Sequence, residues 1–306
     1  MTNPRSQSGD RWLDHAIAVL PDRWVKATWK NDGPSLRKLF IPPYQAMDIT
    51  GLELEKTPDE LTAIRTMGQA ANRLLAEFGQ PPQDIDPTLI HFLEDTAATD
   101  ELLEGGEAVT TCGRIYLRRR PDLEWNVFIL THELAHLIAF TVMLMRTARK
   151  SGGTGLEVTE LALQRSGLGR HDKRLGGPYR TRFLALNEAV TEMVASGIRK
   201  RLPDDGPLAR LISLDDVRTM VSEWQALELT VALYQSLAAD AAERRVLRRM
   251  LVNDYLTCNR DFLRLLTERR PEAVKLLLSL NAKPTDIAVA ADVLGFAALA
   301  ERIREP

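Results

Sequence analysis

Residues 127–145 read VFILTHELAHLIAFTVMLM and contain His132, Glu133 and His136 within an almost wholly apolar run. A run of this length is close to what a membrane-spanning helix needs. Arginines flank the run on both sides, and the chain has no second segment of this kind. We therefore expect a buried helix of a soluble protein, which begins after Asp122 and continues through residue 145, and we expect no membrane partner.

The buried run carries the pattern HExxH at residues 132–136. Two histidines four residues apart project from one face of a helix at adjacent turns, so His132 and His136 can bind one zinc ion. Glu133 lies beside them and can accept a proton from a water that the zinc activates. With only five histidines in 306 residues, a chance match is rare. The alternative is a helix with two hydrogen-bonded core histidines.

A catalytic zinc ion takes three protein ligands and keeps one open position, so a third ligand is needed. Residues 137–142 offer no further histidine. Downstream, residues 187–192 read NEAVTE, and a helix would place Glu188 and Glu192 on one face. One carboxylate can bind the metal while the other holds the far nitrogen of a ligand histidine. Glu157 and Glu160 lie closer to His136, but we interpret them as solvated helix charges.

HExxH followed by NExxTE resembles the gluzincin superfamily of zinc metallopeptidases, which includes thermolysin-like proteases and aminopeptidases. The resemblance implies that His132, His136 and Glu188 bind one Zn²⁺. It also implies that Glu133 is the general base and that Glu192 is the partner of a ligand histidine. The expected fold is zincin-like, and the expected substrate is a peptide or protein. The long spacing from His136 to Glu188 departs from thermolysin-like enzymes and leaves room for an insertion.

A peptidase also needs a hydrogen-bond donor for the oxyanion that develops on the attacked carbonyl. Tyr179 precedes Glu188 by nine residues, a spacing that resembles thermolysin-like enzymes. Tyr234 and Tyr255 lie in later predicted helices, as the catalytic tyrosine does in aminopeptidase-like gluzincins. We favour Tyr255, because Tyr179 lies in a glycine-rich insertion. For each tyrosine the alternative is a core side chain with a satisfied hydroxyl.

The pattern along the chain predicts an α+β fold with three parts. Residues 1–58 form an N-terminal segment of unknown role that holds three of the five tryptophans. Residues 59–182 form a zincin-like half with an amphipathic helix, a small sheet, the active-site helix and a glycine-rich basic insertion. We expect residues 151–182 to be mainly loops, with at most one short helix. Residues 183–306 form a mainly α-helical half that carries the third zinc ligand.

The charge balance of 40 basic against 42 acidic side chains gives no general preference for nucleic acid, and we expect none as a partner. Between residues 146 and 182, lysines and arginines outnumber acids by six. Together with arginines 114, 118, 119 and 120, these residues predict a basic rim that favours acidic substrates. The alternative is a solvated basic loop with no role in substrate binding. Two cysteines and no apparent signal segment indicate a reducing, cytoplasmic location.

The leading functional hypothesis is therefore a zinc-dependent peptidase. One alternative is a membrane-associated HExxH protease that uses the apolar run as an anchor. The other is a non-catalytic protein in which zinc stabilises a binding or scaffold surface.

Overall fold

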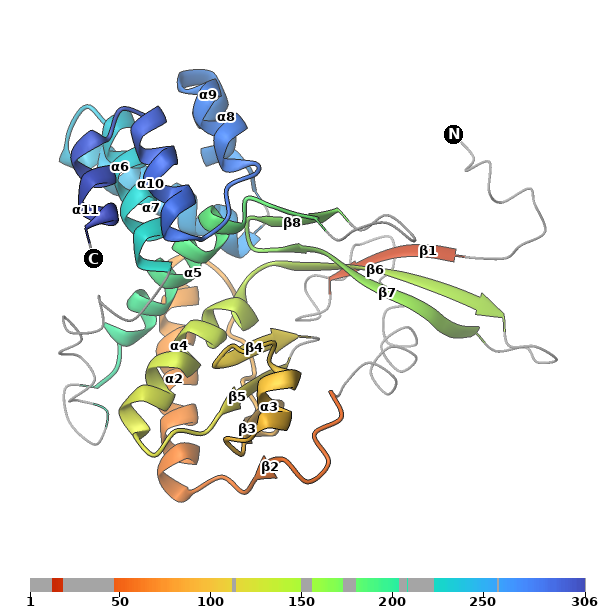
Figure 1. The fold of residues 1–306 in the computed structure, drawn as a ribbon. Helices are drawn as coiled ribbons and strands as arrows, with labels where there is room; N and C mark the ends of the chain where they lie inside the picture. Colours follow the sequence, from red (N-terminus) through yellow and green to blue (C-terminus); the bar gives the residue numbers. More distant parts are fainter. Residues whose placement is uncertain are drawn as a thin grey trace.

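The computed structural model describes residues 13–18, 47–111, 114–149, 156–172, 180–203, 208, 223–257 and 259–305. Within these residues the chain has an α+β fold, with a small mixed sheet beside two long helices and a cluster of further helices at one end (Figure 1). The predicted fold class is therefore confirmed at this level.

The small sheet has the strand order β2-β3-β5-β4. Its members are β2 (Glu53–Leu54), β3 (Ile90–Leu93), β4 (Ala108–Thr111) and β5 (Arg114–Arg118). β3 runs parallel to β5, and the other two pairs are antiparallel. All four residues of β3 are buried. The strands expected before the active-site helix are confirmed, and β4 lies at the edge of this sheet.

Two capped helices pack behind the sheet. Helix α2 (Pro58–Glu77) begins with a reciprocal capping box between Thr57 and Glu60. Helix α4 (Leu123–Ile138) begins at Asp122, whose side chain accepts a hydrogen bond from the Glu124 amide. Helix α4 packs on β4, β5 and α2. Along the chain, the short helices η4 (Pro87–Leu89) and α3 (Ala97–Leu102) lie between α2 and α4. The predicted helix start after Asp122 is confirmed.

The prediction that the α4 helix continues to residue 145 is wrong. The helix ends at Ile138, Ala139 adopts an extended conformation, and strand β6 (Thr141–Arg149) follows. A short apolar run such as TVMLM fits a buried strand as well as a helix, so periodicity could not locate this boundary. Among the described residues, no helix is both long enough and apolar enough to cross a membrane.

The insertion predicted as loops with at most one short helix is mainly β-structure where it is described. Its strands are β7 (Leu156–Ser166), β8 (Gly169–Asp172) and β9 (Arg180–Arg182). With β6 and with β1 (Leu13–Ala18) they form an antiparallel sheet of order β1-β6-β7-β8-β9. Strands β6 and β7 extend away from the helices (Figure 1). Strand β1 is far from β6 in the sequence, so the residues around β6 carry no local pattern that predicts this pairing.

The second half is helical where it is described, as the sequence predicts. It contains α5 (Leu184–Arg199), α6 (Glu223–Leu237), α7 (Ala241–Thr257), α8 (Asp261–Arg269), α9 (Pro271–Leu277), α10 (Pro284–Val293) and α11 (Ala297–Arg304). One hydrophobic core contains buried residues from α2, α4, α5 and the later helices. This core therefore spans both sides of the predicted boundary between residues 182 and 183.

The turn between β7 and β8 is tied to the end of α4 and to α7. The Gly167 amide donates to the Phe140 carbonyl at 2.8 Å, and the Phe140 amide donates to the Tyr255 carbonyl at 3.1 Å. Gly167 has a left-handed backbone with φ of +53°. A β-carbon there would lie 2.4 Å from Tyr255 Cε2 and 2.7 Å from Asn187 Oδ1. This position therefore requires glycine both for its backbone and for its close packing.

We predict that Gly167→Ala lowers the free energy of unfolding by about 2–4 kcal/mol, because backbone strain and overpacking add at this site. Gly79→Ala is the matched control, since Gly79 also has a left-handed backbone, with φ of +67°, but open space around it. The control should lose only the backbone contribution of about 1–2 kcal/mol. Urea denaturation of both variants measures the difference, and equal losses would show that the close packing at Gly167 is unimportant.

Candidate metal centre

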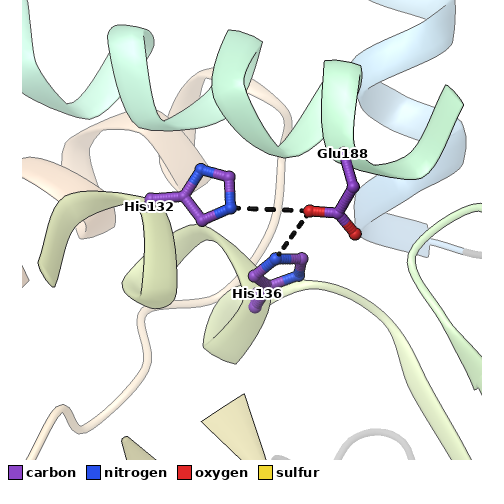
Figure 2. Close-up of side chains that lie close together, drawn as sticks. All are labelled: His132, His136 and Glu188. Atoms are coloured by element: carbon purple, nitrogen blue, oxygen red, sulfur yellow. Dashed lines mark ion pairs between the residues drawn. The ribbon is translucent and has the colours of Figure 1, made fainter. Parts of the chain in front are cut away.

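Helices α4 and α5 pack together and bring the HExxH and NExxTE motifs face to face. Figure 2 shows His132 and His136 of α4 directed at the carboxylate of Glu188 on α5. Glu188 Oε2 lies 3.5 Å from His132 Nε2 and 3.2 Å from His136 Nε2. One ligand atom from each of the three residues lies within 4.8 Å of the other two.

The spacing of these atoms fits a small metal ion. A tetrahedral zinc ion with bonds of about 2.0–2.1 Å separates its ligand atoms by roughly 3.3 Å. The two measured nitrogen to oxygen distances lie on either side of that value. The side chains of His132, His136 and Glu188 are 14%, 18% and 16% exposed, so a small molecule can reach the group. These three residues could therefore hold a metal ion.

The far nitrogen of His132 is held by a buried chain of charged groups. His132 Nδ1 lies 3.3 Å from Glu192 Oε2, which is the contact expected for Glu192. The other Glu192 oxygen accepts a hydrogen bond from Arg199, and Arg199 also donates to Thr131 Oγ1 at 3.0 Å. The Arg199 guanidinium lies 4.6 Å from the centre of the Phe128 ring. Glu192 is thus fixed on both sides, which orients the His132 ring.

The far nitrogen of His136 faces a hydroxyl network. His136 Nδ1 lies 3.5 Å from Thr191 Oγ1. The Thr191 hydroxyl lies 2.9 Å from the Asn187 carbonyl and 2.9 Å from the Tyr255 hydroxyl. When His136 binds a metal through Nε2, its Nδ1 carries the proton and donates toward Thr191.

Asn187 connects the third candidate ligand to the sheet. Its Oδ1 accepts hydrogen bonds from the amides of Leu168 and Gly169, both at 3.0 Å. Its Nδ2 donates to Glu188 Oε1 at 3.3 Å, the oxygen that does not face the histidines. The asparagine of the NExxTE motif therefore orients the Glu188 carboxylate.

Glu133 lies beside the ligand group without belonging to it. Its side chain is buried, and Oε2 lies 2.6 Å from the Thr110 hydroxyl of β4. Among the described residues, Oε1 has no hydrogen-bond partner, so it is available to a water. The sequence placed Glu133 next to the metal ligands, whereas its contact with Thr110 depends on the packing of α4 against β4.

Sequence reasoning did not identify Arg199, Thr191 or Thr110 as parts of the site. Arg199 carries a local signal, because it lies seven residues after Glu192 and so shares its face of α5. Thr191 is in the NExxTE motif, but its contacts with His136 and Tyr255 involve other helices. Thr110 lies on a strand, and its contact has no sequence signal.

The structure describes two of the three candidate tyrosines. The Tyr255 hydroxyl donates to the Ala135 carbonyl at 3.0 Å, and the side chain is fully buried. Burial and the nearby carboxylates of Glu188 and Glu133 raise the pKa of Tyr255 well above its ordinary value. Its contacts are those of a residue that supports α4.

Tyr234 is buried on α6, and no hydrogen bond joins it to the metal group in the described part of the chain. Tyr179 lies outside the described residues. The identity of the oxyanion donor stays a prediction.

The pKa values at the centre reflect strong coupling between opposite charges. Burial tends to raise the pKa of Glu188, but His136 and His132 outweigh it and hold that pKa well below its usual range. Burial tends to lower the pKa of His132, but hydrogen bonds to Glu188 and Glu192 raise it well above its ordinary value. Without a metal, these contacts therefore favour the protonated form of His132.

Two further sequence expectations can be compared with the structure. Glu157 and Glu160 lie on strand β7 and not on a helix.

The three consecutive arginines at the end of β5 form ion pairs, so they add little free positive charge to a substrate rim. The pairs are Arg118 with Asp95 and Asp100, Arg119 with Glu60, and Arg120 with Asp95 and Glu107.

Comparison of the chain with protein-family models, with curated proteins and with solved structures finds no match.

We predict that Glu188→Ala weakens zinc binding by more than about 100-fold. Removing a residue that only hydrogen-bonds a metal ligand lowers metal affinity by about 10–100-fold, and removing a ligand itself should cost more. Glu157→Ala and Glu160→Ala remove the same charge from β7 and should change the affinity little. Competition titration with a zinc indicator measures all three variants. Equal losses would remove Glu188 from the ligand set.

We also predict that zinc binding at pH 7 releases about one proton from His132. The raised pKa of His132 favours its protonated form in the metal-free protein, and zinc needs the neutral imidazole. The affinity should therefore fall as the pH falls. Calorimetry in two buffers of different ionisation enthalpy measures the release. Glu192→Gln removes one of the contacts that raise this pKa and should release less, whereas no release in the wild type would contradict the coupling.

Proposed function

We propose that this chain is a zinc-dependent peptidase of gluzincin type with a zincin-like fold. The observation that carries the proposal is the position of Glu133. It follows the first histidine of the metal-binding group, it is oriented by Thr110, and one of its oxygens is available to a water. A carboxylate in this position is the group that metal-assisted hydrolysis needs beyond the ligands themselves.

His132, His136 and Glu188 would hold the zinc ion. A bound zinc ion lowers the pKa of water and polarises a carbonyl oxygen. Glu133 accepts the proton of the attacking water and delivers it to the leaving amine. The Thr110 hydroxyl donates a hydrogen bond to one oxygen of Glu133, so the other oxygen remains available to accept the proton of the water.

A peptide substrate is supported by the place of β4 at the edge of the small sheet. Among the described strands β4 pairs only with β5, so none of these strands covers its other edge. An extended peptide can add to such an edge as a further strand. Thr110 belongs to β4 and contacts Glu133, so a peptide bound there would lie close to the general base.

The alternatives have less support. A structural zinc site has four protein ligands, and the described residues gather three that are all partly exposed. An anchor built from the apolar run would need a continuous helix, and α4 stops at Ile138. We retain the cytoplasm as the proposed location, on the basis of the two cysteines.

We predict that Glu133→Gln keeps the zinc ion and lowers the cleavage rate by about 10²–10⁴-fold, the usual contribution of general acid-base catalysis. Glu124→Gln is the matched control, because it makes the same chemical change at an exposed position in the first turn of the same helix. Zinc content, melting temperature and digestion of a peptide library are measured for both variants and the wild type.

Two results would contradict the proposal in different ways. Equal cleavage by wild type and Glu133→Gln would mean that Glu133 is not the base. A zinc-loaded wild type that cleaves nothing in the library would indicate a structural zinc ion.

A further inference from the structure

A pocket of about 230 Å³ lies at the N-terminal end of α5. The turn between β7 and β8 and the segment from the start of α8 to α9 both contribute residues to its lining. Its lining combines apolar side chains with two arginines: Leu168, Phe183, Arg260, Leu263, Arg264, Thr267 and Val274. The catalytic groups discussed above are not among these residues.

The pocket is coupled to the candidate metal centre through Asn187. The backbone amide of Leu168 donates to Asn187 Oδ1 at 3.0 Å, and the backbone amide of Asn187 donates to the Phe183 carbonyl at 2.8 Å. Asn187 also donates to Glu188 Oε1. Two lining residues of the pocket are therefore fixed to the residue that orients the third candidate ligand.

The size of the pocket suits a single apolar side chain. An engineered cavity of about 150 Å³ holds benzene, and pockets for drug-sized ligands span about 300–1,000 Å³. The pocket lies between these values. Its apolar lining, made by Leu168, Phe183, Leu263 and Val274, would take a group the size of a leucine or phenylalanine side chain.

The two arginines give the pocket a positive charge. Both are exposed, and Arg264 is paired with Asp261. Arg260 forms no ion pair with any described residue. Asp261 therefore balances the charge of Arg264, whereas the positive charge of Arg260 is not balanced by Asp261. A guanidinium binds a carboxylate through two parallel hydrogen bonds.

We propose that this pocket binds the C-terminal residue of a peptide substrate. The apolar side chain enters the pocket, and the terminal carboxylate binds Arg260 with help from Arg264. The C-terminal residue of a peptide carries its side chain and a carboxylate on the same carbon, so an apolar C-terminal residue matches both the apolar lining and the arginines. The proposal deepens the peptidase function, because it assigns the substrate class as peptides with a free, apolar C-terminal residue.

Binding is tested on the full chain loaded with zinc and carrying Glu133→Gln, so that the peptide is not consumed. The probes are two acetylated tetrapeptides of three alanines and a terminal leucine, one with a free carboxylate and one amidated. We expect the free acid to bind at least about tenfold more tightly, since a charge-assisted hydrogen bond exceeds the energy of a tenfold change. Calorimetry measures both dissociation constants.

The double variant Arg260→Gln/Arg264→Gln should reduce the ratio of the two constants to about one. The control Arg245→Gln/Arg248→Gln removes the same charge from exposed positions of α7 and should keep the tenfold ratio. Val274→Trp fills the pocket and should weaken binding of both peptides. Melting curves verify that each variant is folded.

The outcomes separate this proposal from the proposed function. Equal binding of acid and amide by the parent protein, or a ratio that survives loss of both arginines, would overturn the pocket assignment even if the wild type cleaves peptides. A ratio lost only with Arg260 and Arg264 would support the pocket even if the wild type cleaves neither peptide. A third peptide with an internal glutamate and an amidated end should bind no better than the amide, and tight binding of it would overturn the C-terminal assignment.

Discussion

Charged groups packed between α4 and α5 are the constraint on which the centre of this structure depends. Glu188 and Glu192 project from α5 toward His132 and His136 on α4, and Arg199 contacts Glu192 from behind. Removing such groups from water is costly unless each finds an opposite charge or a hydrogen bond. Here every carboxylate faces a histidine, so the two helices are held in the one register that pairs these groups.

The surrounding elements keep that register. Tyr255 of α7 contacts both the Ala135 carbonyl of α4 and Thr191 of α5, so a third helix bridges the pair. The turn at Gly167 packs against Tyr255 so closely that no side chain fits there. Asn187 joins this turn to Glu188. The antiparallel sheet and the helical half thus both position a group that could hold a metal ion.

The proposed chemistry draws on both parts of the chain. The small sheet supplies Thr110, which orients Glu133, and an open strand edge for an extended peptide. The helical part supplies Glu188 and the pocket with Arg260. A peptidase needs a positioned base, a positioned metal and a means of holding the chain that it cuts. Glu133, the three candidate ligands and the pocket with Arg260 would meet these requirements in the proposed function.

The sequence by itself determined the local features of this protein. The helical repeat puts His132 and His136 on one face, and the same repeat puts Glu188 beside Glu192, because residues four apart lie at adjacent turns. The capping residues Thr57 and Asp122 locate two helix starts, since their side chains satisfy free backbone amides. The β-branched and aromatic residues of 107–120 indicated strands joined by a loop, where the structure has β4 and β5.

Only the tertiary structure decided the features that depend on distant partners. The apolar run after Ile138 became a strand because β1 and β7 pair with it, and no periodicity in so short a run reports such partners. Packing of α4 against α5 selected Glu188 to face both histidines and Glu192 to face the far nitrogen of His132. The sequence allowed either assignment from spacing alone, since spacing along one helix does not specify how another helix lies against it.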